Sequence, residues 1–146
     1  MSSERVLLAR LGAERFAFPL AAISEVAEAP VIAPIALAPH GVAGQCIHRE
    51  RLLPVIDAGA LLGVPRTGGR GVLLLVDGDA GRMALWVDDV LDMVPIEAGQ
   101  RRPLPQTGAA SALLDGVVDL GDGIAALVAM DAMRAVMAAR LTMEAA

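Results

Sequence analysis

The same pattern of apolar and polar residues occurs twice along this chain of 146 residues. An apolar strand at 6–12 is followed, after a short polar turn, by a second strand at 15–20, and the same order recurs at 72–78 and 82–87. Large apolar residues alternate along each second strand, which is typical of an antiparallel strand with one buried face. These residues are Phe16, Phe18 and Leu20 in the first copy and Met83, Leu85 and Val87 in the second. Because each turn also contains a glycine, the sequence predicts two equivalent β-hairpins.

Each predicted hairpin is followed by the same further elements: a short stretch with helical spacing, a proline-rich connection and an apolar strand that ends in aspartate. These elements lie at 23–26, 30–39 and 52–57 in the first copy and at 90–93, 95–105 and 126–131 in the second. Asp88 and Asp89 precede the second helical stretch, where negative charge favours a helix start. The aspartates that end the strands, Asp57 and Asp131, are predicted to cap the helices that follow, because a carboxylate accepts the free backbone N–H groups of a first turn.

The repeat predicts an all-β fold of two small barrels. Each half carries about five short strands. An open sheet of five strands has two exposed edges, and closing the sheet into a barrel removes them. We expect one domain over residues 1–146, with a first barrel at 1–66, a second at 67–130 and a C-terminal helix at 131–146. The segment 64–71, which is rich in glycine, is interpreted as a flexible connection between the halves. Since neither barrel has much core of its own, an apolar contact between them is expected.

Composition argues against several classes of partner. The formal net charge is −5 and the chain has no lysine, whereas nucleic-acid binding needs a basic surface that displaces counterions from phosphates. Hydrophobic residues make up 55% of the chain, yet no run reaches the roughly 18 apolar residues of a membrane span, so direct membrane insertion is not expected. The single cysteine, Cys46, cannot form an internal disulfide, and the N-terminus lacks a secretion-signal pattern, so a cytoplasmic location is expected.

No set of residues predicts catalysis. His40, Cys46 and His48 form a metal-like cluster but lack the paired-ligand spacing of a structural zinc site. The aspartate pairs at positions 77/79 and 88/89 have flanks typical of a turn and a helix start, not of an acid–base pair. We therefore predict a protein that is not an enzyme, with no catalytic residue, no cofactor and no metal.

Several motifs, taken in order, are similar to those of one known family. They are ERFAFPL at 14–20 leading into ISEV at 23–26, then P-x-x-VAG at 39–44, LPVID at 53–57 followed by Leu61 and Leu62, ALWVDDV at 84–90 and LDGVV at 114–118. In this order and spacing the chain resembles the CheW-like adaptor domains of bacterial chemosensory arrays. The resemblance covers nearly the whole chain.

The resemblance implies a fold of two five-stranded SH3-like barrels with short helices and a C-terminal helix. It also implies a scaffold that couples the cytoplasmic tip of a methyl-accepting chemoreceptor to the regulatory domain of a CheA-type histidine kinase. In such proteins the receptor hairpin docks in an apolar groove between the barrels, and the kinase's own CheW-like domain pairs barrel to barrel. The expected location is therefore the cytoplasm, with recruitment to membrane-associated receptor arrays.

Six residues are candidates for partner binding on the strength of this resemblance: Ile23, Glu25, Val26, Gly44, Arg49 and Val87. The chain departs from the family at 47–50, where members usually carry Asn-Leu-Arg-Gly and this chain has Ile-His-Arg-Glu. Arg49 keeps the family's arginine and is interpreted as an interface anchor, with a solvated charge as the alternative. Because glycine at the last of these positions permits a tight turn, Glu50 predicts an altered loop.

Two alternatives to the adaptor role stay open from the sequence. The chain could be a diverged CheW-like protein that serves other partners in a non-flagellar chemosensory system, an interpretation that the altered segment 47–50 favours. It could instead be a small-molecule or metal-binding sensor that uses the cleft between the barrels, with Cys46 and His48 at the rim of that cleft.

Overall fold

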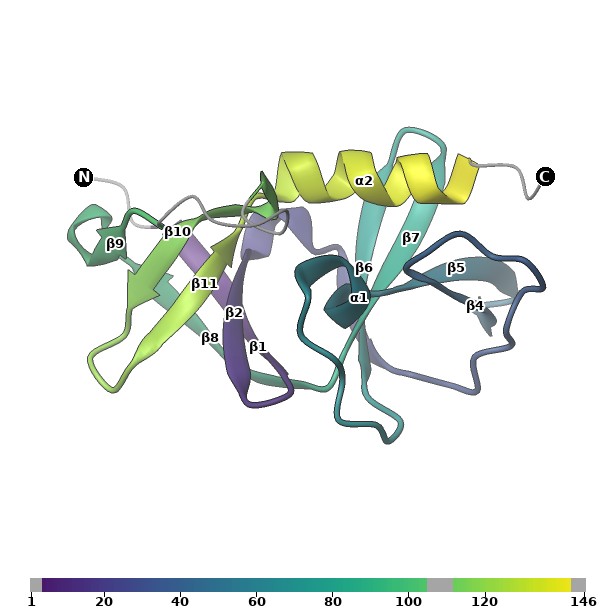
Figure 1. Ribbon diagram of the computed structural model, residues 1–146, viewed down its shortest axis with the longest axis horizontal. Coiled ribbons are helices and arrows are strands. Elements are labelled where there is room, and N and C mark those ends of the chain that lie inside the picture. The colour runs from purple at the N-terminus through teal and green to yellow at the C-terminus, as the bar shows by residue number, and fades with distance from the viewer. Residues whose placement is uncertain (1–3, 105–111, 143–146) are drawn as a thin grey trace.

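The computed structural model describes residues 4–104 and 112–142, whose strands form two curved sheets (Figure 1). The first, barrel A, has the strand order β8 (Asp89–Ile96), β1 (Glu4–Leu11), β2 (Glu14–Pro19), β11 (Ile124–Val128), β10 (Leu114–Asp119) and β9 (Arg101–Arg102). The second, barrel B, has the order β3 (Glu25–Glu28), β6 (Val72–Gly78), β7 (Gly81–Val87), β5 (Arg51–Asp57) and β4 (Val42–His48). The helical segments are η1 (Leu20–Ala22), α1 (Ala58–Leu62), η2 (Ala98–Gln100) and α2 (Met130–Thr142). The predicted all-β class is confirmed.

Each sheet closes through one bent strand. In barrel A, β8 and β9 are successive pieces of one strand interrupted by η2; β8 pairs with β1 and β9 pairs with β10, so the sheet returns on itself. In barrel B the chain beyond β3 returns to the sheet at Ala33, which is bridged to Gln45 of β4. When β8 and β9 are counted as one strand, each barrel has the five strands that were predicted.

The two predicted hairpins are present and meet in a shared core. Phe16 and Phe18 of β2 belong to the same buried cluster as Met83, Leu85 and Val87 of β7, so the alternating faces predicted from the sequence pack together. Two further clusters lie inside barrel A and inside barrel B. The expected apolar contact between the barrels is therefore confirmed, and it is the largest of the three clusters.

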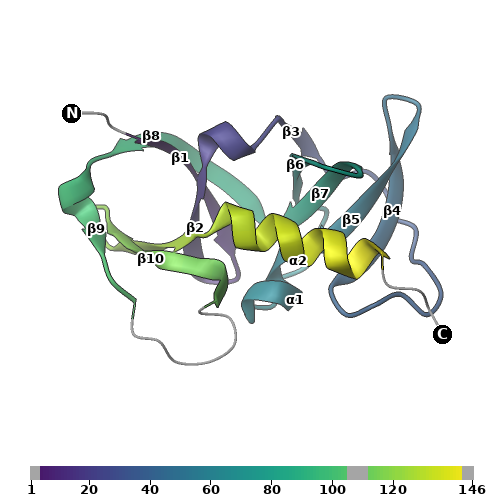
Figure 2. The same ribbon diagram turned by 90° about the horizontal axis from the view of Figure 1, so that it is seen from above.

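Helix α2 lies across the junction between the barrels, as the view from above shows (Figure 2). Its side chains Met133 and Met137 are fully buried in the shared core. The helix was predicted at 131–146 and begins one residue earlier, at Met130; residues 143–146 lie outside the described residues. Asp131 therefore lies in the first turn instead of capping it, with an exposed side chain 3.4 Å from Arg134.

The other predicted cap is confirmed. The carboxylate of Asp57 accepts hydrogen bonds from the backbone N–H groups of Gly59 (2.9 Å) and Ala60 (3.4 Å) at the start of α1. Helix α1 ends at Gly63, whose left-handed backbone (φ 78°) is the usual glycine stop signal.

The predicted boundary between the barrels is wrong. Barrel B is built from strands within 25–87, while barrel A combines 4–19 with 89–128. Each hairpin thus completes the barrel of the other repeat: β5 pairs in parallel with β7, and β11 pairs in parallel with β2. A sequence repeat reveals equivalent strands, but it does not reveal which copy a strand pairs with. Residues 64–71 likewise connect α1 to β6 within barrel B and do not separate the two barrels.

The two stretches with helical spacing are strands. Residues 23–26 lead into β3, which pairs with β6, and 90–93 lie in β8, which pairs with β1. A stretch of four residues fits both a helical turn and an alternating strand, and here pairing with a hydrophobic neighbour strand decides between them. Asp88 and Asp89 consequently do not begin a helix.

Among the helices in 4–104 and 112–142, none has the length and apolar character needed to cross a membrane.

The shared core predicts that the two barrels unfold together. Phe18→Ala removes a fully buried ring from barrel A and should lower the free energy of unfolding by about 3–5 kcal/mol. Trp86, the only tryptophan, lies in β7 of barrel B, so its fluorescence reports on the other barrel. In a urea titration, Trp86 fluorescence and far-UV circular dichroism should shift to the same lower midpoint, whereas the exposed-site control Leu91→Ala should shift neither. An unchanged Trp86 midpoint in Phe18→Ala would show that the barrels are independent.

Candidate functional site

Glu25 is the centre of a charge cluster on barrel B. Arg49 Nη2 lies 2.9 Å from Glu25 Oε2 and donates a hydrogen bond to it, and His48 Nε2 lies 3.3 Å from the same oxygen. Arg82 Nη1 lies 3.9 Å from Glu25 Oε1. The structure therefore brings together Glu25 and Arg49, two candidates from separate motifs, and adds two basic residues around the same carboxylate.

Closure of barrel B creates this cluster. Glu25 opens the edge strand β3 and pairs with Leu75 of β6, while Arg49 lies at the tip of the β4–β5 hairpin at the opposite edge of the sheet. Curvature of the sheet brings this tip to β3. Arg82 is the second residue of β7, which lies between the two edges.

The tip of the β4–β5 hairpin is a two-residue turn between the paired residues His48 and Arg51. Both turn residues have left-handed backbone, with φ 49° at Arg49 and φ 67° at Glu50. A two-residue turn with positive φ at both positions matches the right-handed twist of its strands, but it normally selects glycine or asparagine. The change at Glu50 has therefore left a tight turn in place and made its backbone more strained.

The surface beside this turn is basic. A depression of about 450 Å³ lies there. It is lined by His48, Arg49, Arg51, Leu52, Leu53 and Arg82. On either side of the turn, Ile47 and Leu52 are 61% and 65% exposed. This combination of basic and apolar side chains, on a chain with a net charge of −5, is typical of a protein-binding surface.

A second exposed surface is apolar and lies on the two strands next to the junction of the barrels. Val26 of β3, together with Leu91 and Met93 of β8, is exposed, and Figure 2 shows the two strands along the same side of the molecule. Beneath them Ile23 and Val90 are half-buried against the shared core. We call Val26, Leu91 and Met93, the exposed side chains above this shared core, the apolar rim.

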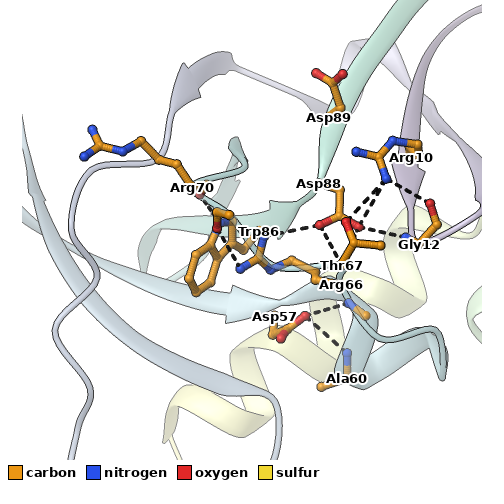
Figure 3. Close-up of polar contacts among 12 residues, drawn as sticks. Arg10, Gly12, Asp57, Ala60, Arg66, Thr67, Arg70, Trp86, Asp88 and Asp89 are labelled. Carbon is orange, nitrogen blue, oxygen red and sulfur yellow. Dashed lines mark hydrogen bonds and ion pairs between the residues drawn. The ribbon is translucent and has the colours of Figure 1, made fainter.

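A polar network ties the same junction together at Asp88 (Figure 3). The Asp88 carboxylate accepts hydrogen bonds from the backbone N–H of Gly12 (2.7 Å) and of Thr67 (3.0 and 3.1 Å). Arg66 Nη1 lies 3.4 Å and Arg10 Nη1 lies 3.8 Å from its oxygens. One side chain thereby joins the β1–β2 turn of barrel A to the loop that precedes β6 in barrel B.

Arg66 is itself held in place. Its guanidinium stacks 3.7 Å from the centre of the Trp86 ring, and the Trp86 indole N–H donates a 2.8 Å hydrogen bond to the carbonyl of Arg70. The loop 64–71, predicted to be a flexible connection, is therefore anchored at three of its residues. Burial alone raises the pKa of Asp88, but the N–H groups of Gly12 and Thr67 and the charge of Arg66 outweigh it and hold that pKa below its ordinary value.

Comparison with known proteins agrees with this geometry. A family model described as the CheW-like domain matches residues 5–136. The chain belongs to the CheW-like family. Its fold is similar to the crystal structure of the scaffolding protein TtCheW from Thermoanaerobacter tengcongensis, with a TM-score of 0.78 and 21% identity over 88% of this chain and 85% of that chain. A comparison with curated proteins finds no significant match. The predicted resemblance and two-barrel fold are confirmed, and the family is one of chemotaxis adaptors.

The six candidate residues of this CheW-like domain fall into two groups. Glu25, Val26 and Arg49 lie at the surface, with Ile23 half-buried below them. Val87 is fully buried in the shared core, and Gly44 is buried where an added Cβ would overlap the backbone of Ala33. These last two residues support the fold and present no side chain to a partner.

Three residues of the surface beside the β4–β5 turn were not predicted from the sequence: Arg51, Leu52 and Arg82. Arg82 lies 57 positions from Glu25 along the chain, and only barrel closure brings the two together. The available signal was the position of Arg82 near the start of the second strand of its hairpin, equivalent to that of Arg15 in the first hairpin.

The metal-like cluster does not assemble into a site. Cys46 is buried inside barrel B among aliphatic side chains, where burial raises the pKa of its thiol and disfavours the thiolate that binds metal. The rim position expected for Cys46 is therefore wrong. Residues 4–104 and 112–142 hold no group of three or more potential ligands.

The Asp88 network predicts a pH-dependent contribution to the stability of this CheW-like domain. Asp88→Asn leaves Arg66 without its buried counter-charge and should lower the free energy of unfolding by about 3 kcal/mol at pH 7. Because the folded pKa of Asp88 lies below its unfolded value, its stabilisation is complete above roughly pH 4 and is lost as the pH falls further.

Urea unfolding followed by Trp86 fluorescence between pH 7 and pH 3 measures this contribution. The difference between the wild type and Asp88→Asn should be constant down to about pH 5 and should shrink below about pH 4. Asp89→Asn, at the exposed neighbouring position, is the matched control and should change little. A difference that persists undiminished at pH 3 would contradict the role of the Asp88 charge.

Proposed function

We propose that this chain is a non-catalytic cytoplasmic adaptor that joins a chemoreceptor tip to a CheA-type histidine kinase at membrane-associated arrays. The observation that carries the proposal is the presence of two exposed surfaces with different chemistry on one rigid body. One is the apolar rim of β3 and β8, and the other is the basic hairpin β4–β5. An adaptor needs two such surfaces, because it must hold both partners at once.

The apolar rim suits the receptor arm of the proposal. Receptor tips of this system are helical hairpins, and an amphipathic helix is bound through a few apolar anchors on a complementary surface. Val26, Leu91 and Met93 supply such anchors, and the shared core keeps the two strands that carry them in a constant position.

The basic hairpin suits the kinase arm. Arg51 and Leu52 are exposed beside the turn. Arginine is enriched at interface hot spots, and the buried centre of an interface is more apolar than its rim. A CheW-like regulatory domain of the kinase would pair with barrel B at this surface, barrel to barrel. Arg49, whose guanidinium is paired with Glu25, anchors the hairpin to β3 within the chain.

Binding to each partner alone tests the proposal. In calorimetry at about 100 μM, where weak signalling contacts register, the chain should bind both a receptor-tip fragment and the regulatory domain of a CheA-type kinase from the same organism. If neither binds, the proposal fails.

Two pairs of variants assign the partners to the surfaces. Val26→Asp places a charge in the apolar rim and should weaken receptor binding at least tenfold, while Val31→Asp, at an 82% exposed position outside it, should not. Leu52→Asp should weaken kinase binding to a similar degree, while Ile124→Asp should not. Ile124 is the matched control because it is 60% exposed on the equivalent hairpin of barrel A. Equal losses in a variant and its control would contradict the assignment.

The second candidate is a diverged adaptor that serves a chemosensory system other than flagellar chemotaxis. The non-glycine turn at Arg49 and Glu50 favours it, because the tip of the proposed kinase surface then differs from the usual one. Binding measurements with the regulatory domain of each CheA-type kinase of the organism separate the two candidates. Tighter binding to the kinase of the flagellar system favours the first, and tighter binding to the kinase of another chemosensory system favours the second.

A further inference from the structure

Four tight hairpin turns within residues 4–104 and 112–142 differ in where they use glycine. At the β1–β2 and β10–β11 turns, the positive φ values fall on Gly12 (58°) and on Gly121 (87°) with Gly123 (149°). At the β6–β7 hairpin the positive φ falls on Gly81 (134°), the first residue of β7 after the turn. In the β4–β5 turn they fall on Arg49 and Glu50. Three hairpins therefore place glycine at the positions with positive φ, whereas the β4–β5 hairpin places arginine and glutamate there.

The side chains of Arg49 and Glu50 are present although they make the left-handed backbone of the turn less stable. A left-handed conformation is disfavoured for a residue with a Cβ, and glutamate lacks the local hydrogen bonding that lets asparagine adopt it. Strained positions of this kind cluster at functional sites, so an observed strain is a reason to look for a role of the side chain.

Arg49 has a role within the fold, because its guanidinium is bound to Glu25. Glu50 has none of this kind: its side chain is exposed and forms no hydrogen bond or ion pair within residues 4–104 and 112–142. The carboxylate is instead placed at the tip of the hairpin between two exposed arginines, Arg49 and Arg51.

We infer that Glu50 is a specificity-determining contact, whose carboxylate pairs with a basic side chain on the kinase regulatory domain that docks on the β4–β5 tip. This inference rests on the proposed adaptor function and deepens it. At the tip, Glu50 lies beside Arg51, whereas the charge of Arg49 is paired with Glu25. A matching partner presents a basic group to Glu50 and an acidic group to Arg51, and a partner that is uniformly acidic at this point is rejected by Glu50.

Two substitutions separate the charge of Glu50 from its backbone strain. Glu50→Gln removes the charge and keeps the Cβ, so it should weaken binding of the kinase regulatory domain about fivefold with little change in Tm. Glu50→Gly removes both, so it should weaken binding to the same degree while raising Tm by roughly 2–4 °C, because the turn relaxes. Glu14→Gln is the matched control, since Glu14 is an exposed carboxylate at the β1–β2 turn of barrel A; it should change neither quantity.

Calorimetry of the full chain measures its affinity for the kinase regulatory domain, and thermal melts measure Tm. For Glu50→Gly we expect a lower affinity together with a higher Tm. The affinity of the wild type should also fall more steeply between 50 and 300 mM salt, on the order of several-fold, than that of Glu50→Gln. Wild-type binding that is unchanged in both Glu50 variants overturns this inference and leaves the adaptor function standing. A wild-type chain that binds no kinase regulatory domain overturns both.

Discussion

Each hairpin of the repeat completes the barrel of the other repeat, and the apolar surface shared by the two hairpins holds the molecule together. Phe18 from β2 and Leu85 from β7 are fully buried in this one cluster, and α2 seals it with Met133 and Met137. Two barrels that each enclose only a small core of their own are in this way joined into one rigid body. Rigidity matters for an adaptor, because the geometry between its two binding surfaces is what it contributes to an assembly.

Asp88 supplies the polar counterpart of this apolar junction. Its side chain is only 1% exposed, and it joins the turn after β1 to the loop before β6 through backbone N–H groups that would otherwise lack partners. The cation–π stack of Arg66 on Trp86 extends the network into barrel B. The apolar rim begins directly beyond this point, since Asp88 immediately precedes β8. The junction and the proposed receptor surface are therefore adjacent parts of one structure.

The sequence revealed the repeated elements but not their exchange. Alternation at Phe16 and Phe18 is a local signal, and it predicted the hairpins and their buried faces correctly. Which copy of β5 or β11 pairs with which hairpin depends on contacts between distant segments, so the boundary near residue 66 was wrong. For the same reason Glu25 and Arg49 were found as separate motif residues, while Arg82, which only the closed barrel brings to Glu25, was missed. Val87 matched a family motif, yet burial in the shared core removes it from any surface.

The proposed adaptor function requires that one chain hold a receptor tip and a kinase domain at the same time. Sedimentation velocity of an equimolar mixture of this chain, a receptor-tip fragment and the regulatory domain of the CheA-type kinase tests it most directly. We expect a single species with the summed mass of all three components at concentrations above both dissociation constants. If the two partners displace each other, so that no species exceeds the mass of a two-component complex, the claim of separate surfaces is contradicted.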